Sequence, residues 1–542
     1  MNKDFILCRN IKIPLTDGDA KAHDALALEA AKRIYDRTLY GKLGKADFSI
    51  YKKSTDARKK DDIRFIYTVC AKPCQPIGEK AVKSALTREF EYVSVDYPEF
   101  ERYKTAKGEK PVVVGLGPSG MFCALALARA GLCPTVLERG SDVDKRTEKV
   151  NEYWQSGRLC EETNVQFGEG GAGTFSDGKL LTRISDALSG YVLNTFCDFG
   201  APSEIKYLAK PHIGTDLLRD IVKNIRNEIV NLGGRVLFDT KLCGINTASD
   251  GRVKSVKVQN GEDIECTALF LCIGHSARDT FGLLLEEGIE VVPKDFSVGV
   301  RIEHLQSDID EALYGRYASH PALEKGQYAL SAKRGGRAVY SFCMCPGGTV
   351  VASASENGQI VTNGMSSYKR DGANANSAIA VSVSAADYGN TVRDAMEYQE
   401  NIERAAFSMT GGAAPVQTVG DFLSSKSGSA PGRITPSYTG KTYLCDIRPL
   451  FPEYVNDMLE YGLGRFEENI RGFAARDAIL TAPETRTSSP VRILRDENRT
   501  SLSCRNIYPS GEGAGYAGGI TSAAVDGLRC AISYLEKTED KR

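Results

Sequence analysis

A glycine-rich turn between a buried strand and a helix is the first feature of the chain with chemical meaning. Residues 111–114 are apolar, and the motif GLGPSG follows from Gly115 to Gly120, before a helix predicted over residues 119–130. The first glycine permits a tight turn, Gly117 lets a pyrophosphate approach the backbone, and Gly120 lets the helix pack on the strand. Free N–H groups at a helix N-terminus attract phosphate. The turn therefore predicts a dinucleotide-binding site.

The next strand strengthens this interpretation, because residues 135–137 end at Glu138, 23 positions after Gly115. A carboxylate at this point accepts hydrogen bonds from a ribose. The same carboxylate would repel a 2′-phosphate, which argues against NADP in this site.

A second glycine loop, IYPSGEGAGYAGGI, occupies residues 507–520 and leads into an alanine-rich helix. An ordinary strand-to-helix turn does not need five glycines. A loop with Glu512 at its head and a helix N-terminus behind it suits the far end of a long ligand, at a group that becomes negative. Reduced flavin, with charge at N1 and the C2 carbonyl, is such a group.

These two loops together resemble the flavoproteins of the glutathione-reductase-like class, in which the first loop holds the ADP half of FAD and the last loop holds the flavin. Four further segments look like a family of bacterial FAD-dependent dehydrogenases, predicted to use NAD and FAD. They are GEGGAGTFSDGKL at 168–180, YSFCMCPGG at 340–348, NGMS at 363–366 and ETRTSSP at 484–490.

The resemblance implies FAD as the cofactor and adds neighbours to it. A strand over residues 239–245 would pass the adenine near Leu242, and a strand over 268–274 would bring Gly274 over the pyrophosphate, with His275, Arg278 and loop 168–173 nearby. The predicted cofactor-binding residues are Gly115, Gly117, Pro118, Ser119, Gly120, Glu138, Arg139, Gly170, Gly171, Leu242, Gly274, His275, Gly511, Glu512, Gly518, Gly519 and Ile520.

The function expected from these motifs is that of an FAD-dependent oxidoreductase, which passes hydride through flavin N5 to or from an unidentified small molecule. NAD(P)H is considered as a transient electron donor. The candidates for handling substrate charge or protons are Lys179, His275, Arg301 and Arg486, with Arg492 behind them. The chain lacks a second GxGxxG motif and a CxxC pair beside the first loop, which argues against a disulfide-reductase mechanism.

The sequence leaves two alternatives to this function open: a flavin-dependent enzyme that modifies RNA, and a flavin redox sensor without turnover. The first depends on a basic N-terminal part, because residues 1–110 carry a net charge of +6 against −7 for the remainder. A basic loop contains Lys52, Lys53 and residues 58–60. Charge runs are usually solvated surfaces.

No metal site is predicted. The fifteen cysteines show no repeated spacing, and the close pairs Cys343–Cys345 and Cys70–Cys74 do not have the paired spacing of structural zinc sites. Most cysteines are interpreted as small buried apolar residues. With only five histidines, no hydrolase constellation stands out.

The elements that must position these motifs predict an α/β fold. It comprises a discontinuous Rossmann-like FAD-binding domain, an inserted antiparallel β-sheet substrate domain and an N-terminal α+β ferredoxin-like module. The predicted bounds are 1–108 for the module, 109–290 and 481–542 for the FAD-binding domain, and 291–480 for the substrate or cap domain.

Within the module, strands are predicted at residues 5–14, 49–53, 63–70 and 92–97, and helices at 24–39 and 79–90, which is the βαββαβ order. Residues 295–371 read as hairpins, with turns expected at Asn357-Gly358 and Asn363-Gly364.

Composition sets outer limits on the function. With 542 residues, 42% hydrophobic and 26% charged residues and a net charge of −1, the chain is typical of a globular protein and not of a polyanion-coating one. Neither a signal peptide nor a membrane span is visible, because the longest apolar run is broken by glycines, a proline and Arg129. We expect a cytoplasmic protein with a small-molecule partner; the sequence does not predict the oligomeric state.

Overall fold

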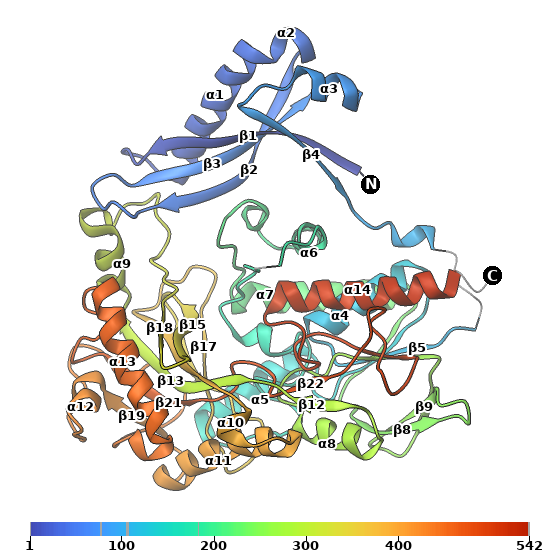
Figure 1. The fold of residues 1–542 in the computed structure, drawn as a ribbon, viewed down its shortest axis with the longest axis vertical. Helices are drawn as coiled ribbons and strands as arrows, with labels where there is room; N and C mark the ends of the chain where they lie inside the picture. Colours follow the sequence, from blue (N-terminus) through green and yellow to red (C-terminus); the bar gives the residue numbers. More distant parts are fainter. Residues whose placement is uncertain (1, 76–77, 104–107, 183, 540–542) are drawn as a thin grey trace. The chain divides into compact units, whose positions relative to one another are not determined.

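The computed structural model describes residues 2–75, 78–103, 108–182 and 184–539. Its internal contacts divide the chain into two compact units. The first unit comprises residues 1–99, 185–212 and 307–326, and the second comprises 100–184, 213–306 and 327–542. Both are drawn in Figure 1.

The first unit is built on a four-stranded antiparallel sheet in the order β2-β3-β1-β4. Helix α1 buries His23, Ala27, Ala31 and Tyr35 against this sheet, a four-residue spacing that puts them on one helix face. Its elements are β1 (Asn2–Pro14), α1 (Ala20–Thr38), α2 (Tyr40–Leu43), β2 (Ala46–Asp56), β3 (Arg64–Pro73), α3 (Glu79–Ala85), β4 (Phe90–Asp96), α6 (Leu188–Asp198) and most of α9 (Gln306–Tyr314).

This element order contains the predicted βαββαβ order, but the lengths of several elements differ from the prediction. Strand β2 is longer than the predicted 49–53, and the short helix α2 was not predicted. Helix α3 ends at Ala85, although the sequence pattern predicted a helix to Phe90. The reason is that Phe90 already pairs with Cys8 as the first residue of β4, so the chain must leave the helix before it.

The core of the second unit is a five-stranded parallel sheet in the order β23-β11-β5-β6-β7. Strand β5 is buried along its whole length, as expected for a parallel strand covered on both faces. The strands are β5 (Pro111–Val114), β6 (Thr135–Leu137), β7 (Arg235–Leu237), β11 (Ala268–Leu271) and β23 (Ile507–Pro509). This observation confirms a mixed α/β fold class.

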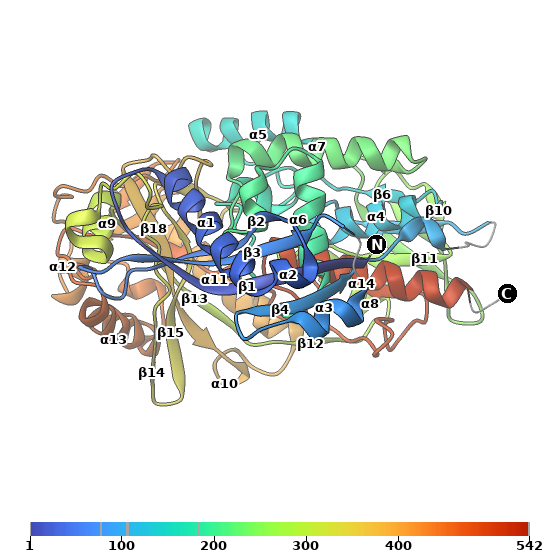
Figure 2. The ribbon, with the colours of Figure 1, turned by 90° about the horizontal axis from the view of Figure 1, so that it is seen from above.

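Helix α4 (Pro118–Arg129) and helix α14 (Ile520–Glu539) lie side by side on this sheet (Figures 1 and 2). They approach closely at Gly527, where a Cβ atom would stand 2.0 Å from the carbonyl oxygen of Ser119. The two helices that follow the two glycine loops are therefore packed directly on each other. Helices α5 (Val143–Ser156) and α7 (Thr215–Asn231) contact each other in the same unit (Figure 2).

A seven-stranded sheet in the order β14-β15-β18-β13-β21-β19-β20 forms the second half of this unit. Its pairings are antiparallel except for β19 with β20. The strands are β13 (Phe296–Leu305), β14 (Ser331–Arg334), β15 (Arg337–Cys345), β18 (Asn374–Val383), β19 (Ala414–Thr418), β20 (Thr442–Leu444) and β21 (Ile479–Glu484), accompanied by α10 (Ala385–Tyr388), α11 (Val392–Thr410), α12 (Val419–Leu423) and α13 (Glu453–Asn469).

The hairpin turns differ in part from the sequence prediction. Asn357-Gly358 lies in the loop of the hairpin formed by β16 (Thr349–Ala352) and β17 (Thr362–Met365), but Asn363-Gly364 lies inside β17 and makes no turn. The tight hairpin between β14 and β15 instead turns at Gly335 and Gly336, which both have positive φ. A two-residue hairpin turn of this kind favours Asn-Gly or Gly-Gly, and here the pair is Gly-Gly. Helix α9, which falls in the same region, was not predicted.

Three small sheets complete the unit: β10-β9-β8, β12-β22 and β16-β17. Their strands are β8 (Leu242–Thr247), β9 (Val253–Val258), β10 (Asp263–Glu265), β12 (Val291–Pro293), β16 (Thr349–Ala352), β17 (Thr362–Met365) and β22 (Val491–Ile493); helix α8 (Arg278–Glu286) follows β11. Across the part of the chain that the structure describes, every helix is too short or too polar to cross a lipid bilayer.

Candidate cofactor and substrate site

A cavity of about 330 Å³ lies within the second unit, and both glycine loops line it. The first loop contributes Gly115 and Gly117, and the second contributes Glu512, Gly518 and Gly519. Residues 507–520 and 115–120 are therefore brought to one site although nearly 400 positions separate them in the sequence.

The glycines of the first loop have different roles. A Cβ atom on Gly115, which has φ +96°, would stand 2.3 Å from the carbonyl oxygen of Cys272, and one on Gly120 would stand 1.9 Å from the carbonyl oxygen of Gly115. These two glycines are required by packing. Gly117 has an ordinary φ of −75°, and its Cβ atom would meet no protein atom nearer than 3.7 Å. The space in front of Gly117 belongs to the cavity.

Glu138 holds three parts of the cavity wall together. Its carboxylate accepts hydrogen bonds from the backbone N–H groups of Leu116 (2.8 Å), Gly140 (2.9 Å) and Gly168 (3.0 Å). The side chain is buried and lines the cavity. Three of about four acceptor positions of a carboxylate are thus occupied, so one is left for a ligand.

The loop at residues 164–171 is shaped around a buried guanidinium group. Arg146 of α5 donates to the carbonyl oxygens of Asn164 (2.9 Å), Val165 (2.9 Å), Glu169 (2.6 Å) and Gly171 (3.0 Å). Burial lowers the pKa of Arg146 to about 10. The guanidinium group remains charged at neutral pH, so these bonds are charge-assisted.

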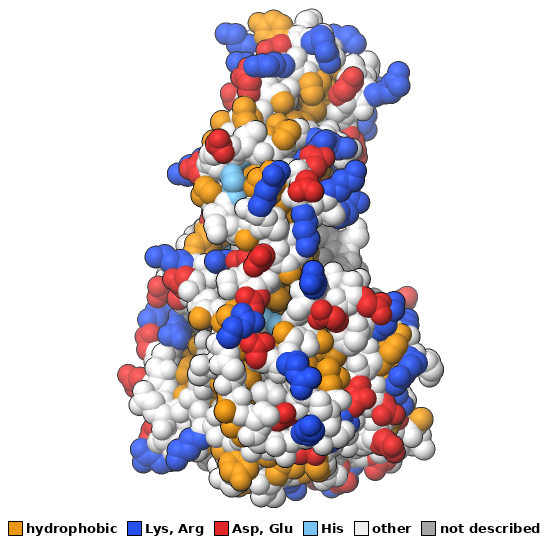
Figure 3. Space-filling view, turned by 90° about the vertical axis from the view of Figure 1, so that its left-hand side faces the viewer, with side chains coloured by type: hydrophobic (Ala, Val, Ile, Leu, Met, Phe, Trp, Pro, Cys, Tyr) orange, Lys and Arg blue, Asp and Glu red, His pale blue; other side chains and the backbone are white. Residues whose placement is uncertain are grey.

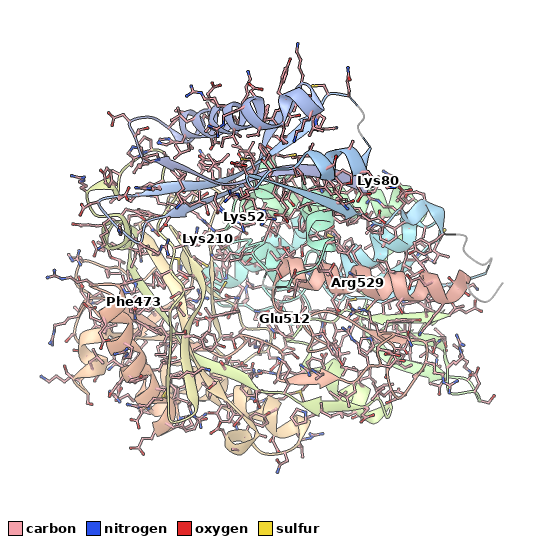
Figure 4. The ribbon with its side chains drawn as sticks, turned by 45° about the horizontal axis from the view of Figure 1, so that its top comes forward. Lys52, Lys80, Lys210, Phe473, Glu512 and Arg529 are labelled. Atoms are coloured by element: carbon pink, nitrogen blue, oxygen red, sulfur yellow. The ribbon has the colours of Figure 1, made fainter. Side chains whose placement is uncertain are left out.

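The second loop is tied to α14 and to the first loop. The N–H group of Gly511 donates to Asp526 of α14 (2.8 Å), and the hydroxyl groups of Ser510 and Ser119 form a hydrogen bond of 2.8 Å. Glu512 lies in the interior of the unit (Figure 4). Burial raises the pKa of Glu512 to about 7, although the N–H group of Gly519 acts in the opposite direction.

Polar side chains from other elements also line the cavity. Lys179 lines the cavity, and its ammonium group contacts Asp177 at 2.5 Å and donates to the carbonyl oxygen of Met344. Glu484 and Asn363 line it as well, and Arg301 binds Glu484 from behind through two bonds of 2.9 and 3.0 Å.

A buried cluster of two arginines and one glutamate supports the wall near His275. Arg278 and Arg486 both donate to Glu403, at 2.9 Å from each. Burial would raise the pKa of Glu403, but the two arginines lower it to about 2. Burial, together with Arg486 and Arg278, lowers the pKa of His275 to about 4. His275 is therefore neutral at pH 7.

Most of the predicted residues lie together in this cavity. Fourteen of the seventeen predicted cofactor-binding residues line it, namely Gly115, Gly117, Pro118, Ser119, Glu138, Arg139, Gly171, Leu242, Gly274, His275, Glu512, Gly518, Gly519 and Ile520. Gly120, Gly170 and Gly511 are not among the described lining residues, because each is packed against a neighbouring loop or helix. Their assignment as ligand contacts remains a prediction.

The four catalytic candidates divide in the same way. Lys179, His275 and Arg486 line the cavity. Arg301 has no exposed surface and is not among the described lining residues; it lies behind Glu484. Arg492, which donates to the carbonyl oxygen of Gly515, is likewise not among them.

Sequence reasoning missed several residues that line or organise the site. Asp177, Asn363 and Glu484 stood within quoted motifs but were not proposed for a role, and Cys343 was considered only as a metal ligand. Arg146 carried no sequence signal, because a single arginine on an amphipathic helix normally faces solvent.

Comparison with known proteins places residues 295–487 in the family described as FAD-dependent protein, C-terminal domain-like. The chain is also 23% identical over 198 residues to a ribosomal RNA dihydrouridine synthase of Haemophilus influenzae, a match that covers 34% of this chain and 46% of that protein. Among solved structures, a geranylgeranyl bacteriochlorophyll reductase-like protein of Thermoplasma acidophilum is 12% identical over 80% of each chain, with a TM-score of 0.34. A similarity at that level supports no conclusion about activity.

The strongest of these similarities extends over almost the whole chain. An uncharacterized protein of Clostridium beijerinckii is 47% identical over 528 residues, which cover 94% of this chain and 97% of that protein. The chain therefore belongs to the same family as this clostridial protein, and its residues 295–487 form a domain found in FAD-dependent proteins.

Proposed function

We propose that the protein is an FAD-dependent oxidoreductase that exchanges hydride with a small-molecule substrate. The observation that carries this proposal is that both glycine loops line the same cavity as Lys179, Glu484 and Arg486. The match of residues 295–487 to a domain of FAD-dependent proteins supports the same cofactor.

The residues present fit such a cofactor. At Gly117, Gly274, Gly518 and Gly519 a Cβ atom would meet no protein atom closer than 3.7 Å, so the cavity comes directly to the backbone at both loops. A pyrophosphate and a flavin ring both require this kind of approach. The N-termini of α4 and α14, which follow the two loops, supply free N–H groups and positive dipole ends.

Each part of the cavity then has a distinct task. Gly117 and the start of α4 would hold the pyrophosphate, Glu138 would use its remaining acceptor position for the ribose, and Gly518 to Ile520 would face the flavin. When bound, FAD supplies two-electron transfer at flavin N5.

The chain's own residues prepare the substrate end. Glu403 fixes the position of Arg486, so its guanidinium group is held in one place at the cavity wall. Neutral His275, whose Nδ1 atom lies 2.9 Å from the hydroxyl oxygen of Ser276, offers a hydrogen bond without charge. Lys179 shares the buried Asp177 carboxylate with Arg370, so this group of three charges has a net positive charge.

The first test is spectroscopic. We expect the purified protein to be yellow, to release FAD rather than FMN on denaturation, and to be reduced in an anaerobic titration with NADH or NADPH. NAD(P)H would act as a transient visitor, because the described cavity has one set of nucleotide-binding loops. A colourless protein that binds no added FAD would contradict the proposal.

A matched pair of variants tests the placement of the cofactor. Gly117→Ala fits the protein backbone, so it should leave the fold intact while its methyl group weakens FAD binding by about 1–3 kcal/mol, the usual effect of an extra methyl group in a close-packed contact. Gly464→Ala on the exposed side of α13, where a Cβ atom also meets open space, is the control. Equal FAD affinity in the two variants would place the pyrophosphate elsewhere.

The RNA-modifying alternative is not favoured by the charge distribution. The first unit as a whole carries 23 basic and 22 acidic residues, because segments 185–212 and 307–326 offset the excess near the N-terminus. Basic and acidic side chains are interspersed on the face drawn in Figure 3. The partial match to a ribosomal RNA dihydrouridine synthase keeps one experiment relevant: salt-dependent binding of ribosomal RNA would revive this alternative.

A redox sensor without turnover is also not favoured, because the charged side chains of Lys179, Glu484 and Arg486 line the same cavity as the glycine loops. FAD that is bound but cannot be cyclically reduced and reoxidised would support a purely structural flavin.

A further inference from the structure

Strand β15 contains a bulge where it reaches the cavity. Its pairing with β18 changes register between Phe342 and Cys345, and Cys343 has a φ of +43°. A non-glycine residue in this conformation is strained by about 1–3 kcal/mol, and bulges often redirect a side chain beside a functional site. Cys343 lines the cavity, whereas Cys345 has no exposed surface.

Two cationic side chains hold this bulge in place. Arg301 donates to the carbonyl oxygen of Cys343 at 3.1 Å, and Lys179 donates to the carbonyl oxygen of Met344. Both cations are themselves fixed, Arg301 by Glu484 and Lys179 by a buried aspartate. Two ion-paired cations therefore hold the strained segment in place.

The Cys345 thiol lies directly against the backbone of Cys343, because it donates to the carbonyl oxygen of Cys343 at 3.2 Å. The neighbouring Cys345 thiol lowers the pKa of Cys343, and Arg301 and Lys179 act in the same direction against burial. The Cys343 thiol and burial raise the pKa of Cys345.

The surroundings of Cys343 differ from those of Cys272, another cysteine that lines the cavity. Burial raises the pKa of Cys272 to about 12, as for an inert buried thiol. Cys343, in contrast, interacts electrostatically with Glu512 of the second loop and raises the pKa of that carboxyl group. Lys179, which holds the bulge at Met344, adjoins Leu180, and the carbonyl oxygen of Leu180 accepts a hydrogen bond from Thr521 of α14 (2.8 Å). Cys343 thus lies on the side of the cavity where the flavin is expected.

We propose that Cys343 and Cys345 form a redox-active dithiol that exchanges two electrons with the cofactor. Cys343, accessible from the cavity, is the reactive thiol, and buried Cys345 is its resolving partner, an arrangement typical of redox-active cysteine pairs. Oxidation breaks two S–H bonds, forms one S–S bond and releases two electrons and two protons. The electrons pass to the oxidised flavin, and the protons pass to the flavin and to solvent. The exchange step rests on the proposed function, whereas the existence of the pair does not.

The pair itself is tested without any redox activity of the cofactor. The full-length protein is equilibrated in glutathione buffers of graded potential, quenched in acid, alkylated and mapped by mass spectrometry. We expect Cys343 and Cys345 to lose their thiols together in a single transition, with the loss of two hydrogen atoms from one peptide. In Cys345→Ser, Cys343 should instead form a mixed disulfide with glutathione.

Electron transfer is tested by anaerobic dithionite titration of protein that has first been oxidised with diamide. We expect the wild-type protein to take up four electrons per FAD and Cys343→Ser or Cys345→Ser to take up two. Cys160→Ser, which changes a half-buried cysteine outside the described lining residues, is the control and should still take up four.

Each result has a defined meaning. Recovery of both residues as free thiols in every buffer, or glutathione on Cys343 while Cys345 stays free in the wild-type protein, would overturn the dithiol. A dithiol that forms while wild type takes up only two electrons would overturn the exchange with the cofactor. Absence of FAD would contradict the proposed function, and the thiol mapping would still decide whether the pair exists.

Discussion

Replacement of Glu138 by glutamine provides the sharpest test of how the cofactor cradle is held together. The glutamate carboxylate accepts three backbone N–H groups, two at Oε1 from Gly140 and Gly168 and one at Oε2 from Leu116. A glutamine keeps only one acceptor atom. It can serve the first two donors, but its amide nitrogen then faces the N–H group of Leu116, and that donor is left without a partner.

The magnitude follows from this count. One buried donor without an acceptor is unfavourable by about 1–3 kcal/mol. The loss is divided between folding of the apoprotein and FAD binding, because the Leu116 and Gly168 loops contribute to both. If it fell on binding alone, the dissociation constant for FAD would rise about 5- to 150-fold, since 1.4 kcal/mol corresponds to a factor of ten.

The assay therefore measures both quantities on the same protein: the affinity for FAD by quenching of its fluorescence, and the free energy of unfolding of the apoprotein in urea. Glu265→Gln is the control, because Glu265 is an exposed carboxylate paired with Lys110 on the surface, where such pairs contribute about 0–1 kcal/mol. If the two effects of Glu138→Gln add up to no more than those of Glu265→Gln, the organising role of Glu138 is refuted.

Three further outcomes are expected. Gly120→Ala should abolish soluble protein, because its Cβ atom would overlap the carbonyl oxygen of Gly115; normal expression and circular dichroism would contradict this packing. A bulky residue at Gly519 should lower the flavin reduction potential in spectroelectrochemical titration while FAD stays bound, with about 30 mV for each tenfold change; an unchanged potential would move the flavin away from α14. Arg301→Met should lower the free energy of unfolding in urea by about 3–5 kcal/mol, because it leaves Glu484 buried without its partner. Addition of Glu484→Gln should recover part of this loss; no recovery would show that the arginine acts through packing.

The sequence predicted the part of the site that depends on backbone geometry. At Gly115 and Gly120 a Cβ atom would stand 2.3 and 1.9 Å from a backbone carbonyl oxygen, so only glycine fits at these two positions. A sequence that folds this way must therefore show the same glycine spacing. The strand at 111–114, the strand at 135–137 and the position of Glu138 follow from the same local pattern. The second loop could be predicted for the same reason, because Gly519 needs a positive φ.

Side chains that act across the fold were not predictable in this way. Arg146 faces inward because four carbonyl oxygens of a loop about twenty residues further along the chain converge on it, which no local pattern encodes. The same applies to Glu403 of α11, which meets Arg278 and Arg486 only after the parallel and antiparallel sheets have come together.

Cys343 shows why residue spacing alone was misleading. In a regular strand, positions 343 and 345 project from the same face at a fixed separation, and the sequence then offers only a pair too closely spaced for a zinc site. The bulge changes this geometry: it gives Cys343 a positive φ, places it at the cavity and leaves Cys345 buried in hydrogen-bond contact with it. That bulge depends on Arg301 and Lys179, which come from β13 and from the 168–180 motif. The chemistry of the pair therefore arises from the tertiary contacts of two residues that the sequence had singled out for a different role, as groups handling substrate charge.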